Sequence, residues 1–466
     1  MHDKDFNHEP RGEFRGNFSR DTYDPFRHFS RVLMQQGRVQ LDSDWNEQVS
    51  IFWHYLRGLA KDLGGEHWAP ANGQTKGYKI TSSNTKGLQD FQIGEGTYYV
   101  QGVRCENENS DLRYTTQYGY PFPDSEEIEV GKRYLVYLDV WERHLTYVED
   151  DYTREVALNG PDTAARSKIV WQAKIKVIDE DVGGFKENYQ KFLDELGSLK
   201  KPGRGQLRAR AKKNKTENEK PCLVTPQANF RGTENQLYRV EIHKEGPAGT
   251  ATFKWSRENG AVIFPIAAFG DTTVTLEHLG KNRPFDLKVN DWVEIVDDFY
   301  ALRGKAEPLL QVEFIDHESL EVTLKNMQPL NSSGIMERHP YLRRWDHKTD
   351  LNDGDLSVVE SKGEGIENWL LIENGVEIQF LEIDGGIEKP IYKTGDYWII
   401  PARIATGDVQ WPKEMNNISN ELISKALHPH GVQHYYAPID EMTVDGKGQI
   451  AKPKDIRRTL KKAWSK

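Results

Sequence analysis

Several features that normally guide a functional assignment are scarce or missing in this chain of 466 residues. Only two cysteines occur, Cys105 and Cys222, so we expect a reducing compartment rather than a disulfide framework. No apolar run is long enough to span a bilayer, and the polar start MHDKDFNHEP contains no secretory signal. The motifs GxGxxG, Walker A, HExxH, CxxC and GxSxG are absent. We therefore expect a cytoplasmic protein without a cofactor.

Positive charge is also in deficit. The formal net charge is -10 and the pI is near 5.8, which argues against nucleic acid as the main partner. Aromatic residues, in contrast, are plentiful, with 12 Trp, 20 Tyr and 18 Phe. Aromatic side chains are favoured in strands and at protein interfaces, and they also form platforms for sugars. The aromatic excess does not choose among these uses.

The first clear structural signal is segment 28–48, which reads HFSRVLMQQGRVQLDSDWNEQ. An apolar run ends at Gln36-Gly37, and a short alternating stretch follows. A helix start is expected at Asp44, with Glu47 at the capping-box spacing. The pattern predicts a strand, a turn and a helix. Because the segment carries no catalytic residues, it favours docking over turnover.

The helix is predicted over Asp44 to Leu63, and Gly64-Gly65 supplies its C-terminal cap. Apolar and aromatic side chains recur on one of its faces, which suits contact with another surface. We expect an interface with partner subunits to include Trp45, Phe52, Trp53 and Leu56.

Strand-forming residues dominate from residue 97 onward. The run LVYLDVW at 135–141 is nearly continuous in apolar residues, as in a strand buried on both faces. Short strands separated by turns between 236 and 324 indicate a small barrel or sandwich. We predict a mainly β, multidomain protein of small β-barrel or sandwich domains, with an N-terminal helix and a short C-terminal helix.

The predicted domain organisation follows these patterns. An N-terminal arm and attachment helix (1–70) precede a first β domain (71–199), a basic loop or linker (200–225), a second β domain (226–330), a third β-rich domain (331–440) and a C-terminal tail with a short helix (441–466).

Two of these segments are defined by charge. The loop contains KKPGRGQLRARAKKNK. A basic patch that binds nucleic acid is the alternative interpretation of this stretch. No aromatics interleave with the basic residues, so a linker is favoured.

In the tail, residues 455–466 place apolar side chains on one helical face and basic ones on the other. We expect Ile456, Leu460 and Trp464 to form a second interface.

Three histidines, His428, His430 and His434, have the spacing H-x-H-x3-H, which can gather imidazoles around zinc or another divalent ion. Pro429 and Gly431 place them on a loop, and no cysteine lies nearby. A solvated or packing loop is the favoured interpretation, and no metal is assigned.

Asp139 and Glu142 stand near the end of the buried strand and resemble a glycosidase carboxylate pair. The alternative is structural pairing with Arg143 or Arg154, which we favour. Asn259-Gly260 is a type I′ turn signal and predicts a hairpin after the strand at 253–255. No catalytic residue is assigned.

Longer motifs carry a resemblance to a known family. They read FSRDTYDPFRHFSRVLMQQGRVQLDSDWNEQ, YLVYLDVWERHLTYVED, EVALNGPDTAARSKIVWQ, ENQLYRVEIH, TFKWSRENGAV, TGDYWIIPARIATGDVQWP and HPHGVQHYYAP. Over about residues 17 to 440 the chain resembles an uncharacterised bacterial family encoded in phage-tail-like contractile injection system loci. The segment RVLMQQGRVQLDSDWNEQVSI is similar to N-terminal segments of phage tail-fibre and baseplate-peripheral proteins.

The resemblance implies a non-enzymatic structural or adaptor component of a contractile injection particle, at the baseplate, its periphery or a tail attachment. It implies as partners the other subunits of the particle, a homo-oligomer in the assembly, and neither nucleic acid nor a direct membrane span. The alternative is a carbohydrate-binding or carbohydrate-cleaving module carried on such a particle. Copy number, position, and membrane anchoring or release by lysis stay open.

Overall fold

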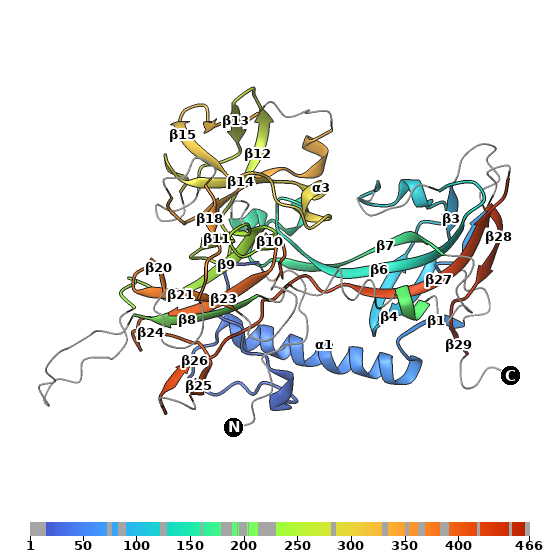
Figure 1. The fold of residues 1–466 in the computed structure, drawn as a ribbon, viewed down its shortest axis with the longest axis horizontal. Coiled ribbons are helices and arrows are strands. Elements are labelled where there is room, and N and C mark those ends of the chain that lie inside the picture. The colour runs from blue at the N-terminus through green and yellow to red at the C-terminus, as the bar shows by residue number, and fades with distance from the viewer. Residues whose placement is uncertain are drawn as a thin grey trace, which may run out of the picture.

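The structure is a computed structural model. The residues that it describes are 15–71, 77–82, 90–121, 128–158, 160, 162–178, 189–192, 194, 203, 205–212, 230–280, 286–328, 334–349, 354–361, 369–382, 391–416, 420–446 and 450–461. The mainly β fold predicted from the sequence is confirmed: three β units surround a common centre, and one long helix lies beneath them (Figure 1).

The helix α1 (Asp42–Gly64) confirms the prediction and begins two residues earlier than expected. The predicted cap at Asp44 is wrong, because Leu41 is the N-cap and the Asp44 carboxylate accepts a hydrogen bond from the Leu41 amide at 3.1 Å. Gly65 ends the helix with φ 87°, a conformation that favours glycine. The turn at Gln36-Gly37 is present, but no strand precedes the helix among residues 15–41.

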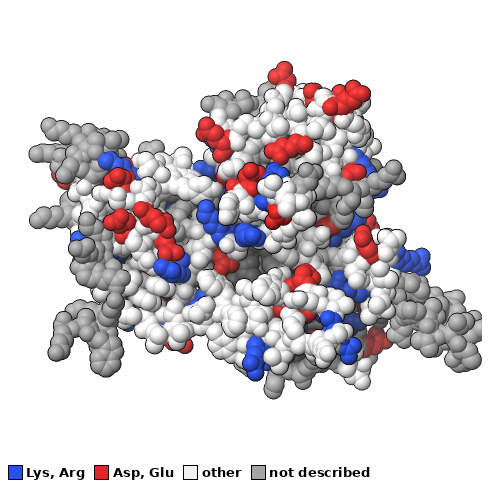
Figure 2. Space-filling view, turned by 180° about the vertical axis from the view of Figure 1, so that it is seen from behind, with Lys and Arg blue, Asp and Glu red and all other residues white. Residues whose placement is uncertain are grey.

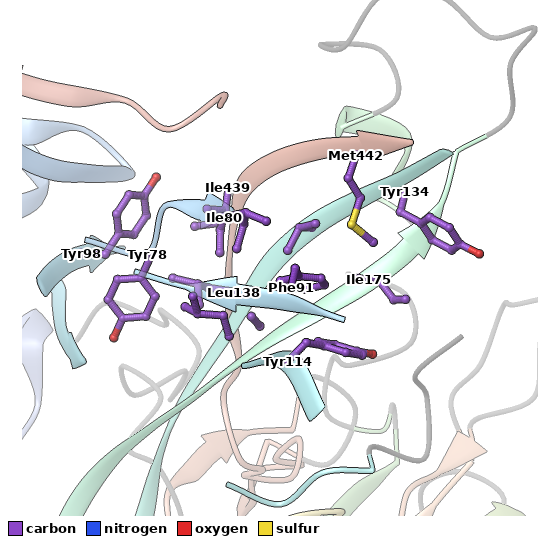
Figure 3. Close-up of a cluster of buried hydrophobic side chains, with 14 of the residues drawn as sticks. Tyr78, Ile80, Phe91, Tyr98, Tyr114, Tyr134, Leu138, Ile175, Ile439 and Met442 are labelled. Atoms are coloured by element: carbon purple, nitrogen blue, oxygen red, sulfur yellow. The ribbon is translucent and has the colours of Figure 1, made fainter. Parts of the chain in front are cut away.

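The first β unit contains two four-stranded sheets, β28-β27-β6-β7 and β29-β1-β4-β5. The strands are β6 (Arg133–Leu145), β7 (Arg166–Val177), β27 (Tyr435–Val444), β28 (Ile450–Asp455), β1 (His67–Ala71), β4 (Gly96–Val100), β5 (Val103–Asn107) and β29 (Thr459–Lys461). The hairpin β2 (Ile80–Ser82) and β3 (Phe91–Ile93) packs with them. Tyr78, Tyr98 and Leu138 point into their shared core (Figure 3).

The second β unit is a pair of facing sheets, β18-β11-β9-β23-β24 and β19-β21-β20 with β8 added to β21. The strands are β8 (Gln206–Ala211), β9 (Gln236–Lys244), β11 (Thr252–Ser256), β18 (Leu356–Ser357), β19 (Glu360–Ser361), β20 (Leu370–Glu373), β21 (Val376–Leu381), β23 (Tyr397–Arg403) and β24 (Asp408–Val409). Trp398, Phe380 and Tyr238 are buried between these sheets. There are also two small two-stranded sheets: β10 (Gly246–Pro247) with β22 (Ile391–Tyr392), and β25 (Lys413–Met415) with β26 (Leu422–Ser424).

The third unit is a closed six-stranded barrel, which confirms the expected small barrel. Its strands are β12 (Ile263–Phe269), β13 (Thr273–Leu276), β14 (Trp292–Val296), β15 (Leu310–Asp316), β16 (Glu321–Lys325) and β17 (Tyr341–Trp345). The short helices with described bounds include η1 (Pro25–Arg27), η2 (Tyr114–Thr116), η3 (Asp151–Thr153), η4 (Val156–Leu158), α3 (Asp298–Ala301) and η5 (Met336–Arg338). The barrel is the upper lobe, and acidic side chains outnumber basic ones on its face in Figure 2.

Sheet pairing crosses the boundaries drawn from the sequence. Strand β27 pairs with β6, and β23 pairs with β9, although the members of each pair were placed in different domains. Strand β8 lies in the expected basic loop, yet it pairs with β21 over six residues. Its alternation explains this pairing, because Leu207 and Ala209 are fully buried while Arg208 and Arg210 point the other way. Six residues of that loop are therefore a strand of the second β unit.

The expected C-terminal helix is wrong over the described residues. β28 continues to Asp455, and β29 (Thr459–Lys461) pairs in parallel with β1. Leu460 stands opposite Pro70 in this pairing, and Ile456 packs against Leu135 and its neighbours. Backbone pairing to β1 satisfies groups that a short isolated helix leaves exposed. Trp464 lies outside the described residues.

Replacing Leu207 with Ala should lower the free energy of unfolding by about 2–4 kcal/mol, because it leaves a cavity in the core between the two sheets. Urea denaturation followed by circular dichroism measures this loss. Leu371→Ala is the matched control, since Leu371 is 59% exposed on β20. Equal losses in the two variants would contradict a buried β8.

Candidate functional site

The outer face of α1 is apolar along its whole length. Six large side chains are each 50–68% exposed and recur at alternating spacings of four and three residues: Trp45, Val49, Phe52, Leu56, Leu59 and Leu63. This is the a/d spacing of a coiled-coil helix, repeated without interruption. We call these six residues the helix seam.

The inner face of α1 makes mostly polar contacts with the body. The Trp53 indole donates a hydrogen bond to Glu142 on β6 at 3.0 Å, and the Arg57 guanidinium lies 4.8 Å from the centre of the Tyr435 ring. Among the apolar side chains of this helix, Ile51 is the fully buried one. An amphipathic helix at a protein surface normally turns its apolar stripe inward, so α1 has the opposite orientation.

The N-terminal arm holds α1 at its first turns. The Ser19 hydroxyl and amide both donate to the Asp42 carboxylate, at 2.5 and 2.8 Å, and the Thr22 hydroxyl donates to Glu47 at 2.6 Å. Further along the arm, Leu33, Met34 and Val39 are exposed and extend the apolar surface next to the helix.

The predicted interface residues are therefore placed differently from one another. Trp45, Phe52 and Leu56 face solvent in the helix seam, so their role as an interface stays a prediction. Trp53 is half-buried and bonded to Glu142 within the chain. The expected helical stripe of Ile456 and Leu460 does not form, because both residues lie in the extended C-terminal segment.

The three β units meet through buried charged side chains. On β9, Arg239 and Glu241 alternate with apolar residues of the second core and point away from it. The Glu241 carboxylate pairs with Arg239 at 2.6 Å and with Arg15 of the arm at 2.8 Å. Lys254 lies 3.6 Å from Glu241 and 2.6 Å from Glu294 of the barrel. We call these five residues the central network.

Burial by itself raises the pKa of the Glu241 carboxyl, but the positive charges of Arg15, Arg239 and Lys254 outweigh it and hold that pKa well below its usual range. The Glu241 carboxyl is therefore ionised, and opposite charges join the arm, the second unit and the barrel.

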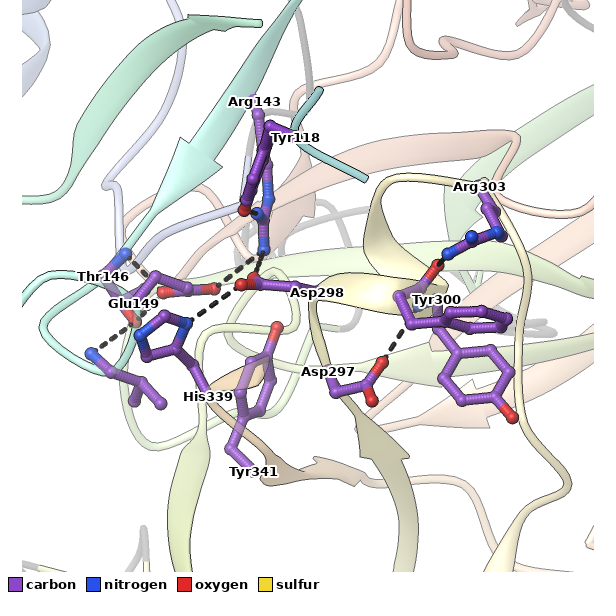
Figure 4. Close-up of polar contacts among 12 residues, drawn as sticks. Tyr118, Arg143, Thr146, Glu149, Asp297, Asp298, Tyr300, Arg303, His339 and Tyr341 are labelled. Carbon is purple, nitrogen blue, oxygen red and sulfur yellow. Dashed lines mark hydrogen bonds and ion pairs between the residues drawn. The ribbon is translucent and has the colours of Figure 1, made fainter. Parts of the chain in front are cut away.

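A second cluster joins the first unit to the barrel. The Arg143 guanidinium donates to Asp298 at 2.6 Å and lies 3.7 Å from Glu149, while His339 lies 2.9 Å from the other oxygen of Asp298 (Figure 4). Burial lowers the pKa of Arg143, but Asp298 opposes this and the net pKa is raised. The neighbouring Asp297 caps α3.

The carboxylate pair considered for glycoside cleavage is separated by the strand itself. The β6–β7 register is regular, so Asp139 and Glu142 point to opposite faces of the sheet. Asp139 is fully buried, with Lys174 at 2.8 Å and His434 at 2.6 Å. Both carboxylates have structural partners, as the favoured interpretation held, although these partners differ from the expected Arg143 and Arg154.

The three histidines do not converge. His434 contacts Asp139, His428 lies 3.3 Å from the Gln206 side chain, and His430 pairs through its backbone with Tyr397. Within the described ranges, no group of three His, Cys, Asp or Glu residues is arranged to hold a metal ion.

The turn predicted at Asn259-Gly260 is present, but it does not form a hairpin. Both residues have positive φ, at 54° and 68°, as a type I′ turn requires. The flanking strands β11 and β12 belong to different sheets, however, so the turn is a corner between the second unit and the barrel. The Asn259 amide donates to the Gly16 carbonyl and holds the arm there.

A cavity of about 270 Å³ lies at the centre, between β6, β9, β14 and the loop after α3. Eight Lys or Arg side chains and four Asp or Glu side chains line it, together with Trp141 and Tyr341. Sequence reasoning missed this site. The signal was present in the stretch YRVEI at 238–242, where Arg239 and Glu241 alternate with apolar and aromatic residues.

Asp396 on the cavity wall gives a test of this electrostatic environment. Burial raises the pKa of its carboxyl to about 7, from 3.8. Between pH 3.8 and about 7, the Asp396 carboxyl stays protonated in the folded chain but is ionised in the unfolded chain. The stability that comes from burying the neutral Asp396 carboxyl is therefore fully present below pH 4, and it is lost as the pH rises through 7.

Asp396→Asn should remove the fall in stability at rising pH, because the asparagine side chain is neutral at every pH. Relative to the parent chain, it should gain roughly 2–4 kcal/mol of stability between pH 4 and pH 8, at about 1.4 kcal/mol per pH unit. Urea denaturation across this range measures the change. For Asp111→Asn, at an exposed position, the free energy of unfolding should depend on pH as it does in the parent chain. The same pH dependence in Asp396→Asn and the parent chain would contradict the raised pKa of Asp396.

Comparison with known proteins identifies a family but no activity. Searches among curated proteins and among solved structures found no match. Among the described residues, no helix is long and apolar enough to cross a membrane. A family described as "Family of unknown function (DUF6519)" matches residues 14–200 and 199–449, which together cover most of the chain. The chain belongs to this family.

Proposed function

We propose that this protein is a structural or adaptor subunit of a phage-tail-like contractile injection particle, which docks through its N-terminal arm and α1. The observation that carries the docking role is the helix seam, whose six apolar side chains face solvent while the polar side of α1 faces the body. Exposed apolar patches of this kind are typical of protein interaction sites. The link to a particle rests on the resemblance of residues 17 to 440.

The occupant that we propose for the helix seam is the seam of a second copy of this chain. A heptad seam is self-complementary, since each side chain fits into holes formed by the same repeat on a partner helix. The positions that flank it are Asn46, Gln48, Trp53, Tyr55, Ala60 and Asp62. Asp62 is the one charged member, so like-charge repulsion between copies is small. Homo-oligomers are also the commonest assemblies of soluble proteins.

This arrangement leaves the exposed arm residues Leu33, Met34 and Val39 for contact with other subunits. The three β units then form the projecting body. The glycan alternative is weaker, because Asp139 and Glu142 face opposite sides of their sheet and the Trp141 ring is stacked on His434 with 4.8 Å between ring centres.

The double substitution Phe52→Asp with Leu56→Asp should abolish self-association without unfolding the chain. Both side chains are more than half exposed, so their loss costs the isolated chain little, whereas each buried contact in an interface is worth about 2 kcal/mol or more. Light scattering after gel filtration measures the oligomeric state. Tyr152→Asp with Val156→Asp, at exposed positions outside the helix seam, is the matched control and should behave as the parent chain.

Particle membership is tested separately in the producing cell. The chain should co-purify with sheath and baseplate proteins, and particles from cells lacking it should show altered morphology. Normal particles in its absence, with no copy of the chain in purified particles, would overturn the proposed function. A monomeric parent chain would overturn only the self-pairing of the helix seam.

A further inference from the structure

The cavity at the centre of the molecule contains positive charge that the protein itself does not neutralise. Several of its basic side chains are matched: Arg143 pairs with Asp298, Lys174 with Asp139, and Arg239 and Arg15 share Glu241. Three others, Arg343, Arg303 and Lys305, have no carboxylate oxygen within 4.0 Å among the described residues.

Arg343 is the most informative of these three. It is 8% exposed and lines the cavity from β17. Its Nη2 donates to the Tyr341 hydroxyl at 2.8 Å, while its buried Nε has no hydrogen-bond partner among the residues that the structure describes. A guanidinium stays protonated in proteins, and an unpaired buried charge is costly. The Arg343 charge is therefore not compensated by a paired carboxylate of the described residues.

The nearest candidate within the chain is already engaged. Glu294 stands opposite Arg343 in the β14–β17 register. One of its oxygens, Oε2, accepts hydrogen bonds from Lys254 at 2.6 Å and from the Trp345 indole at 3.0 Å. The carboxylate is thus drawn toward β11 and the Trp345 side chain, and it does not reach within 4.0 Å of the Arg343 guanidinium.

Arg303 is a second donor group in the lining of the cavity. Its guanidinium donates to the carbonyls of Phe299 and Gly119, at 3.0 and 3.3 Å, and to that of Pro121. Neutral carbonyls orient the group but leave its charge uncompensated. Burial, followed by the nearby positive charge of Arg338, lowers the pKa of Arg303, as expected where cations are crowded.

We propose that the central cavity binds a small oxyanion, a molecule bearing carboxylate or phosphate groups, with Arg343 and Arg303 as its principal ligands. The planar fork of an arginine matches the paired oxygens of either group. The volume of about 270 Å³ limits the ligand to the size of a small metabolite. Tyr341 and the edge of the cavity at Trp141 add aromatic side chains to its lining. This site is independent of the proposed particle function, since it lies away from the helix seam.

Isothermal titration calorimetry of the full chain at low ionic strength tests the site, with citrate and inorganic phosphate as separate probes and chloride as the reference anion. We expect saturable binding of at least one oxyanion that weakens as salt is added. Citrate alone would indicate a carboxylate ligand, and phosphate alone a phosphate-bearing one. No saturable binding of either probe, or equal binding of chloride, would overturn the proposal.

Variants locate the binding in the cavity. Arg343→Gln should raise the dissociation constant at least about tenfold, because a charge-assisted bidentate contact is lost. Arg104→Gln, which removes an exposed arginine on β5, should leave binding unchanged. Lys305→Gln at the exposed cavity rim tests the same site should Arg343→Gln fail to fold, and it should weaken binding less strongly. Unchanged binding in both cavity variants would place the ion elsewhere and overturn the assignment.

Discussion

The buried carboxylate of Glu241 is the group on which the junction of the arm, the second β unit and the barrel depends. Each unit has its own apolar core, and each turns the polar faces of its strands toward the centre. Glu241 joins Arg239 of its own strand, Lys254 of the neighbouring strand and Arg15 of the arm, and Lys254 continues to Glu294 in the barrel. Removing one partner of such a network leaves an uncompensated buried charge, which is far costlier than losing a surface ion pair.

The same constraint explains why the arm and α1 hold a defined position. Arg15 enters the central network, and the residues after it tie the first turns of α1 to the arm. The Trp53–Glu142 hydrogen bond then fixes the middle of the helix on β6. These polar contacts use the inner face of α1, so the helix seam is left outward. The docking surface is therefore a consequence of how the helix is anchored.

The two candidate sites differ in chemistry and in place. The helix seam is apolar, continuous and exposed, which suits a protein partner. The cavity is small, charged and enclosed by three units, which suits a small anion. A ligand that neutralises Arg343 would also stabilise the junction between β9 and the barrel, since it would replace repulsion among cations by attraction.

The sequence by itself determined much of the local structure: periodicity and turn residues gave α1 to within two residues, its glycine cap, the centre of the strand at 133–145 and short strands of the barrel before residue 326. Only the tertiary structure decided which way these elements face. Periodicity shows that Phe52 and Leu56 share a stripe, but an apolar stripe reads the same whether it meets the core or the solvent. Likewise the pairing of β8 with β21, and of Glu241 with Arg15, joins residues more than 150 positions apart, a separation on which local sequence patterns carry no information.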